Sequence, residues 1–205
     1  MTDDTPYVEK KYDTESYRGI VKSAYSDNVK HTIRLGEYPG LRFCTAIDTN
    51  LLEAITKEYG TGVAFGTLIV PATALETVTS FTRTDLQRSG IEFFEVRTRG
   101  YYQDTYYDSE TEEVLDGVKV FAGSLVGLEP DETAGKLSDQ VDVVYAAVGY
   151  VEVYLRDGSG SVVIYSDMVQ TSLAYEAQKY LDKVDGISDE DRVTLTAYAR
   201  KLLPE

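Results

Sequence analysis

The sequence has little of several residues on which common sites depend. Its 205 residues include one cysteine, one histidine and no tryptophan. With Cys44 alone, an intramolecular disulfide is excluded, and a structural zinc site, which usually takes four cysteine or histidine ligands, lacks its donors. Cys44 alternates with Leu41, Phe43 and Ile47, so we expect a small, half-buried strand residue rather than a reactive thiol.

Basic side chains are also scarce. The chain has 20 Lys and Arg against 35 Asp and Glu, which gives a net charge of −15. Nucleic acids and anionic lipids both select basic patches, so we expect neither a nucleic-acid nor a membrane partner. No run approaches the ~18 apolar residues of a membrane span, and the first residues lack a signal-peptide pattern. Two locations stay open: a cytoplasmic protein, or a fragment of a longer secreted one.

Motifs for nucleophilic catalysis are missing from the sequence. His31, the only imidazole, precedes the first expected strand without a nucleophile motif beside it, and a solvated loop position explains it best. The segment Gly158-Ser159-Gly160-Ser161 fits turn chemistry better than a nucleophile elbow. A dinucleotide fingerprint is not matched by the spacing of Gly60, Gly62 and Gly66. We therefore expect no enzyme and no cofactor.

The many carboxylates are too common to be diagnostic. Among 35 acids some pair will always have the separation that a glycan-active hydrolase needs, so that activity stays open as a minor alternative. The aspartates between Asp182 and Asp191 do not follow the spacing of a calcium-binding loop. We expect no metal site, and calcium binding is left open.

Apolar periodicity predicts an α+β fold. Residues 1–29 read as a polar linker or edge segment, and residues 30–205 as one domain. The order is strands, one inserted helix over 51–59, more strands, then two C-terminal helices capped by Ser172 and Ser188. Expected strands cover 41–48, 63–70, 91–96, 118–128, 145–156 and 161–166. Such an order predicts a mainly antiparallel, sandwich-like core. Residues 75–88 are ambiguous.

Two features refine this reading. The segment Asp157-Gly158-Ser159-Gly160 between alternating apolar runs predicts a β-hairpin. Residues 118–128 are apolar on both faces, which is typical of a central strand.

Tyrosine is the abundant exception, with 17 residues. One group lies at a strand end and in an acidic turn, and a second shares one face of the hairpin with Glu152. A tyrosine ring is apolar while its hydroxyl can stay hydrated, so such faces suit sugars or protein surfaces. The competing explanation is that tyrosine forms strands well and fills half-buried sheet positions. The candidate ligand-binding residues are Tyr101, Tyr102, Tyr106, Tyr107, Tyr150, Tyr154 and Arg156.

An ordered series of short segments resembles a known but uncharacterised module. It starts with Thr32-Ile33-Arg34-Leu35 and Pro39-Gly40-Leu41-Arg42-Phe43, followed by 51–60 and by Val63-Ala64-Phe65-Gly66-Thr67-Leu68-Ile69-Val70-Pro71. It continues with Phe121-Ala122-Gly123-Ser124-Leu125-Val126, Gly149-Tyr150-Val151-Glu152-Val153, Tyr165-Ser166-Asp167 and Ser172-Leu173-Ala174-Tyr175-Glu176-Ala177. The series, over about residues 31–184, is similar to a module found near the C-terminus of large surface or secreted proteins of gut Firmicutes.

The resemblance implies a location rather than an activity. It places the chain outside the cell or on its surface, as a fragment beside neighbouring domains, and it supplies no catalytic residue. Together with the tyrosines, it predicts a non-catalytic surface module whose partner is a glycan, a mucin or a cell-wall polymer. The alternative is a structural or protein–protein interaction module without a small ligand.

Overall fold

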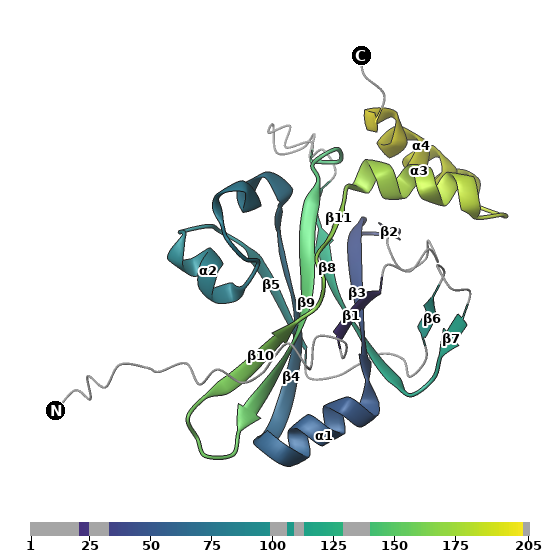
Figure 1. Ribbon diagram of the computed structural model, residues 1–205. Helices are drawn as coiled ribbons and strands as arrows, with labels where there is room; N and C mark the ends of the chain where they lie inside the picture. The colour runs from purple at the N-terminus through teal and green to yellow at the C-terminus, as the bar shows by residue number, and fades with distance from the viewer. Residues whose placement is uncertain (1–20, 25–32, 99–105, 109–112, 129–139, 203–205) are drawn as a thin grey trace.

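The computed structural model describes residues 21–24, 33–98, 106–108, 113–128 and 140–202. Two antiparallel sheets, called sheet A and sheet B, stack face to face, and helices cover their two ends (Figure 1). The α+β fold with mainly antiparallel sheets is confirmed. His31 lies outside the described residues.

Sheet A is built around β3 (Gly40–Asp48). Strand β8 (Val118–Val126) pairs with β3 along its whole length, while β1 (Val21–Ala24) and β2 (Ile33–Arg34) pair with separate stretches of it. Within the described residues β8 pairs with β3 alone, so the expectation of a central strand is wrong. Its two-sided apolar pattern instead reflects burial of both faces, through Val120 on one side and Phe121 on the other.

Sheet B runs in the order β10-β9-β4-β5. Its strands are β4 (Gly60–Pro71), β5 (Phe94–Thr98), β9 (Tyr145–Leu155) and β10 (Ser161–Tyr165), and β11 (Val169–Thr171) also pairs with β9. The predicted hairpin is β9–β10, and its turn contains Gly158 at φ 72°, a left-handed conformation that favours glycine. A separate small hairpin pairs β6 (Tyr106–Asp108) with β7 (Glu113–Leu115).

The inner faces of the two sheets are in direct contact. The rings of Phe65 in sheet B and Phe121 in sheet A lie 5.2 Å apart, centroid to centroid. Nearby, a Cβ at Gly123 would come within 2.6 Å of the Thr67 Cβ, and one at Gly149 would overlap the Thr45 side chain. Small residues therefore let the sheets approach closely at the centre of the sandwich.

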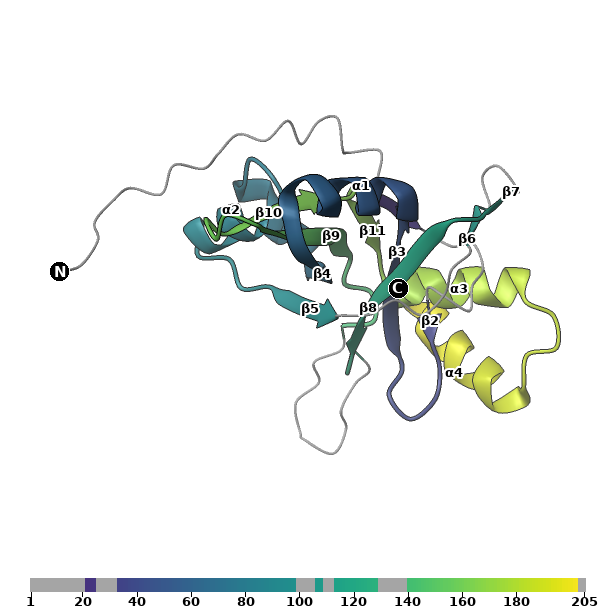
Figure 2. The same ribbon diagram turned by 90° about the horizontal axis from the view of Figure 1, so that it is seen from below.

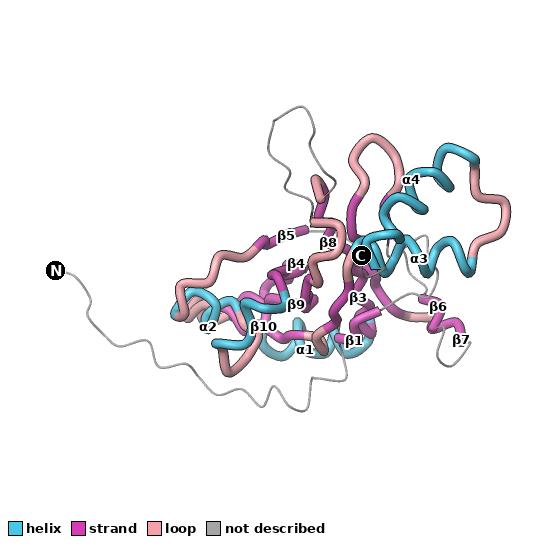
Figure 3. Tube along the Cα trace, turned by 90° about the horizontal axis from the view of Figure 1, so that it is seen from above, coloured by secondary structure: helices cyan, strands magenta, loops and turns pink. Residues whose placement is uncertain are grey.

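Helices close both ends of the sandwich. Helix α1 (Thr49–Tyr59) places Ile55 among the core residues at one end, and α3 (Leu173–Lys183) and α4 (Asp189–Ala199) cover the other, followed by the short η4 (Arg200–Leu202) (Figure 1; helices cyan in Figure 3). The predicted caps are confirmed: the Ser172 and Ser188 side chains accept hydrogen bonds from the backbone N–H of the residue three positions on. None of the described helices is long and apolar enough to cross a membrane.

Residues 75–88, whose secondary structure the sequence left ambiguous, form no strand of either sheet. Between β4 and β5 the chain forms η3 (Ala72–Thr77) and α2 (Arg83–Arg88), whose N-cap is Thr82. Leu86 of α2 is buried against Leu68, Val70 and Val148 of sheet B. This excursion covers part of the sheet face that points away from sheet A (Figures 1 and 2), and it positions the site described next.

Candidate functional site

The face of sheet B that points away from sheet A divides into two halves. The covered half, beneath α2 and η3, consists of Leu68, Val70, Val148, Tyr150 and Tyr165. The second half, called the open half, lies beyond the excursion and consists of Gly62, Ala64, Glu152, Tyr154 and Ser161, which are neighbours across β4, β9 and β10. Tyr154 is exposed and Gly62 and Ser161 are half-buried, while Ala64 and Glu152 are buried. The alternation of side chains along a strand places both halves on one face.

Tyr150 is the centre of the covered half and is 0% exposed. Its ring lies over Gly66, where an added methyl group would overlap it. The guanidinium carbon of Arg83 lies 4.9 Å from the ring centroid, a cation–π contact. Tyr165 stands beside Tyr150 with ring centroids 6.0 Å apart, and its hydroxyl accepts a 3.1 Å hydrogen bond from the Arg83 backbone N–H. These contacts fasten α2 to the sheet.

Glu95 joins the arginine to the tyrosine. Its Oε1 accepts a 2.6 Å hydrogen bond from Arg83 Nη2 and a 2.5 Å hydrogen bond from the Tyr150 hydroxyl. Burial, and then the hydrogen bond to Glu95, raise the pKa of Tyr150 above its ordinary value. Burial opposes the charged form of Arg83, but the hydrogen bond and the charge of Glu95 outweigh it and raise the pKa of the guanidinium. Both side chains are thus held in their protonated forms.

Glu152 connects this cluster to the open half. Its Oε2 accepts a 2.5 Å hydrogen bond from Arg97 Nη2 and lies 3.8 Å from Arg83 Nη2, while its Oε1 accepts a 2.7 Å hydrogen bond from the Ser161 hydroxyl. Arg97 Nη2 also donates to the Tyr154 hydroxyl at 3.2 Å. Two arginines and two glutamates therefore share one network, and their formal charges cancel locally.

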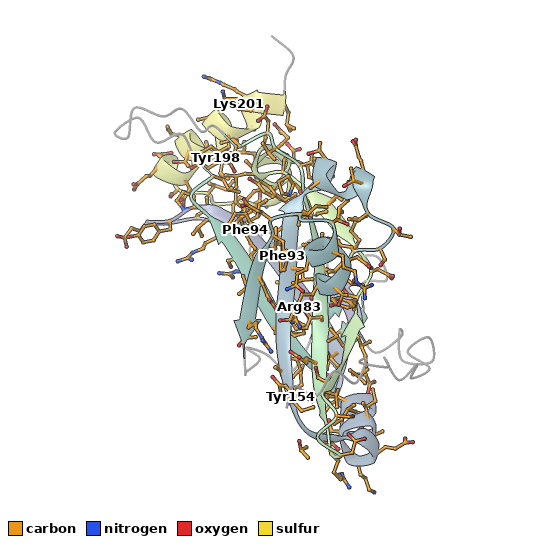
Figure 4. All side chains as sticks on the ribbon, turned by 90° about the vertical axis from the view of Figure 1, so that its left-hand side faces the viewer. Arg83, Phe93, Phe94, Tyr154, Tyr198 and Lys201 are labelled. Carbon is orange, nitrogen blue, oxygen red and sulfur yellow. The ribbon has the colours of Figure 1, made fainter. Side chains whose placement is uncertain are left out.

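Tyr154 presents an accessible aromatic ring at the end of this network. It is 40% exposed, and Arg97 beside it is 49% exposed. Its cross-strand neighbours are Gly62 on β4 and Ser161 on β10, both too small to cover the ring. The nearest atom of Tyr154 would lie 4.0 Å from a Cβ at Gly62. Figure 4 shows Arg83 between Phe93 and Tyr154 along the length of the sheet.

The residues expected to bind ligand do not form one cluster. Tyr101 and Tyr102 lie outside the described residues, and Tyr106 and Tyr107 belong to the separate hairpin of β6 and β7. The expectation that a ligand could reach Tyr150 is corrected by its burial under Arg83. The sequence showed the face of the sheet to which Tyr150 belongs but gave no sign of the covering excursion.

Arg156 binds the C-terminal end of helix α1. Its Nη2 donates to the Lys57 carbonyl at 2.9 Å and to the Gly60 carbonyl at 3.4 Å. Carbonyls at a helix C-terminus lack intrahelical partners, so this arginine satisfies them. It also lines an open depression of about 500 Å³ between α1 and β4. Of the seven expected residues, Tyr154 alone is shown exposed beside the charged network.

Three residues of the site were missed at the level of sequence. Glu95 and Arg97 alternate on β5 and so share one face, a pattern that the sequence does carry. Arg83 lies in the segment without a clear period and could not have been assigned to the sheet. Its contact with Glu95 spans 12 residues and its contact with Glu152 spans 69, which no local motif reveals.

The open half offers the exposed ring of Tyr154 beside the hydrogen-bond donors of Arg97, which the buried Glu152 holds in place. This set can stack on an apolar ring and bind several hydroxyl groups. In the described part of the chain, no three His, Cys, Asp or Glu side chains gather closely enough to hold a metal ion. No family model, no curated protein and no solved structure matches the chain.

Proposed function

We propose that this protein is a non-catalytic binding module of the cell surface or extracellular space, and that it takes a glycan on the open half of sheet B. The observation that carries the proposal is the exposed ring of Tyr154, whose hydroxyl accepts a hydrogen bond from Arg97 and whose cross-strand neighbours are the small residues Gly62 and Ser161. Mucin and cell-wall polymers are the glycans that the expected location would offer.

The chemistry of a pyranose matches this surface. One face of the sugar ring consists of C–H groups, which pack on an aromatic ring, while its edge carries hydroxyls that both donate and accept. Tyr154 supplies the ring, and the N–H groups of Arg97 that are not bonded to Glu152 or Tyr154 supply donors, while the buried Glu152 holds Arg97 in place. Because Arg97 and Glu152 already hold each other, the site is organised before the ligand arrives, which lowers the entropic cost of binding.

The same contacts favour binding over bond cleavage. Both carboxylate oxygens of Glu152 already accept hydrogen bonds, from Arg97 and from Ser161. A glycoside hydrolase needs one carboxyl group that delivers a proton to the leaving oxygen. Glu95 is likewise occupied by Arg83 and Tyr150. Neither glutamate is arranged for that step.

A second candidate function is protein–protein contact within a multidomain surface protein. The observation that favours it is Phe94, a large apolar side chain that is 53% exposed on β5, the outermost described strand of sheet B. Single exposed apolar residues are common on proteins, so Phe94 supports this function only together with its outermost position in the sheet.

The glycan proposal is tested by presenting the full chain to an array of mucin O-glycans and peptidoglycan fragments, followed by calorimetry on any hit. Tyr154→Ala should weaken binding at least about tenfold, because it removes the stacking surface. Tyr175→Ala is the matched control: Tyr175 lies on α3 and is 54% exposed, so its loss should change nothing.

Two results would contradict the glycan proposal. One is the absence of any hit on either polymer class. The other is a hit whose affinity is unchanged by Tyr154→Ala, which would place the ligand elsewhere on the molecule.

A further inference from the structure

The two charged groups beside Tyr154 differ in their exposure. The side chain of Glu152 is 9% exposed, whereas that of Arg97, which donates to it, is 49% exposed. The carboxylate is therefore buried, and the charged group that solvent meets beside the Tyr154 ring is the guanidinium of Arg97.

Three N–H groups of Arg97 are not used by the part of the chain that the structure describes. Its Nη2 donates to Glu152 and to Tyr154, and these are the hydrogen bonds that Arg97 makes there. A guanidinium has five N–H donors and no acceptor, so the two of Nη1 and the one of Nε remain. Because Glu152 holds the guanidinium, these donors are oriented before a ligand arrives.

Acceptors are scarce in the open half. Both oxygens of Glu152 already accept hydrogen bonds, and the Ser161 hydroxyl donates its proton to one of them. The Tyr154 hydroxyl accepts from Arg97, so its own proton is left to donate. The other two residues of the open half have no polar side chain. A surface that mainly donates matches a group that only accepts, and an ionised carboxylate is such a group.

The position of the guanidinium suits a ligand that stacks on Tyr154. The Tyr154 hydroxyl lies 3.2 Å from Arg97 Nη2, so the guanidinium stands at the hydroxyl end of the ring. A sugar whose C–H face lies on the ring would have its edge within hydrogen-bond reach of the guanidinium. A carboxylate attached to the sugar ring projects from that edge.

We propose that the glycan of the open half is acidic, with its ring stacked on Tyr154 and its carboxylate accepting charge-assisted hydrogen bonds from Arg97. The inference rests on the proposed function and names the class of sugar. A sialic acid of a mucin and a uronic acid of a cell-wall polymer share this chemistry, and the experiment separates them.

Two effects limit the affinity. The net charge of −15 repels an anion at long range, although charges more than about 8 Å apart are largely screened at physiological ionic strength. The buried Glu152 also offsets the charge of Arg97, so the gain comes from charge-assisted hydrogen bonds at direct contact. We therefore expect modest affinity with a clear preference for the acidic sugar.

Matched pairs of glycans test this preference on the full chain. One pair is sialylated mucin O-glycans and the same glycans after sialidase treatment, and the other is polygalacturonate and neutral galactan. In calorimetry, the acidic member of at least one pair should bind at least about tenfold more tightly than its neutral counterpart. The pair that shows the preference identifies the source of the sugar.

Two variants and one direct readout locate the contact. Arg97→Gln removes the charge and keeps N–H donors, and it should reduce the preference to less than about twofold. Arg88→Gln is the matched control, because it removes the same charge from an exposed site on α2 and should leave the preference unchanged. In nuclear magnetic resonance of the unaltered chain, the Nε–H signal of Arg97 should shift as the acidic glycan is added.

The outcomes distinguish this inference from the proposed function. Neutral glycans that bind as tightly as acidic ones, and more weakly to Tyr154→Ala, would overturn the acidic ligand and leave the glycan proposal standing. The acidic ligand is also overturned if the preference survives Arg97→Gln, if Arg88→Gln loses it as well, or if the Arg97 Nε–H signal stays in place at saturation. Absence of binding to every glycan would overturn both proposals.

Discussion

The covered and open halves of sheet B share strands and a face, yet the tyrosine of the covered half is buried and that of the open half is exposed. In the covered half Tyr150 is sealed beneath Arg83 and its hydroxyl is bound to Glu95. In the open half Tyr154 keeps an exposed ring and shares its hydroxyl with Arg97, which is itself half exposed. What separates them is the excursion between β4 and β5, which extends over one tyrosine and ends before the other.

Glycines on β4 illustrate the same difference. The ring of Tyr150 lies where a side chain at position 66 would be, so Gly66 lets the tyrosine pack directly on the sheet. Gly62 stands beside Tyr154, and an added Cβ would make only an ordinary contact with it. One glycine is needed for packing and the other leaves room beside an exposed ring. Identical residues on one strand thus have different roles.

The largest predicted difference between the halves comes from their arginines. Arg83→Ala should lower the free energy of unfolding by about 3 kcal/mol, because it uncovers the Tyr150 ring and leaves the Glu95 carboxylate without its cation. Arg97→Ala should cost only about 1 kcal/mol, because Arg97 is half exposed and Glu152 retains Ser161 as a donor. Urea denaturation of both variants measures the difference.

Arg88→Ala serves as the control for this pair. Arg88 lies on the same short helix as Arg83 but is largely exposed, and its nearest approach to Asp85 is 4.0 Å. Its removal should change the free energy of unfolding by less than about 0.5 kcal/mol. Equal costs for Arg83→Ala and Arg97→Ala would show that the cover does not set the two halves apart.

The fold could be read largely from the sequence, because its signals are local. The strand over 41–48, the Asp-Gly turn and the serine caps are each set within a few residues, and each is present as predicted. The expectation that this strand is half-buried is wrong, because Cys44 and Ala46 on its second face are buried as well. The position of β8 could not be read, since an apolar pattern reports that both faces are buried and does not report what lies beside the strand.

The candidate site was only half predictable for the same reason. Tyr150 and Tyr154 were placed on one face with Glu152, which follows from the period of a strand. Whether that face is covered depends on Arg83 and Leu86, which reach it from a segment with no clear period. Burial of a strand face is decided by what folds over it, and here that element is distant in sequence.

Glycine substitutions on β4 should also affect the stability of the two halves differently, by smaller amounts. Gly66→Ala places a methyl group under 3.0 Å from atoms of Tyr150, which is too close for contact. This variant should lower the free energy of unfolding by about 2 kcal/mol, the usual cost of overpacking. Gly62→Ala meets nothing closer than 4.0 Å and should change stability by no more than about 0.5 kcal/mol. Thermal unfolding followed by circular dichroism distinguishes the two.

A further outcome connects these glycines to function. If a glycan stacks on Tyr154, Gly62→Ala should weaken its binding while stability is kept, because the methyl group narrows the space beside the ring. A large loss of stability in Gly62→Ala would mean that the open half is as tightly packed as the covered half, contrary to the structure.

The smallest predicted effects are those of the two hydroxyl groups. At pH 7 Tyr150→Phe should cost about 1 kcal/mol, because it removes the hydrogen bond to Glu95 from a buried site. Tyr154→Phe should cost less than about 0.5 kcal/mol, because its hydroxyl shares an exposed arginine. The ring that would stack on a glycan is kept in Tyr154→Phe, so glycan binding should also survive. Equal costs for the two variants would contradict the distinction between the halves.

Alkaline pH should enlarge the effect at Tyr150 in a defined direction. The pKa of Tyr150 is raised in the folded protein, first by burial and then by Glu95, so its proton is held more tightly than in the unfolded chain. That contribution to stability is complete below the unfolded pKa of about 10 and is lost as the pH rises beyond it. Tyr145 and Tyr165, whose pKa values burial also raises, behave alike and remain in the variant. The unaltered chain should therefore lose more stability than Tyr150→Phe between about pH 9 and pH 11, measured by urea denaturation at each pH. Parallel losses in the two proteins would show that Tyr150 ionises freely and that α2 does not seal it.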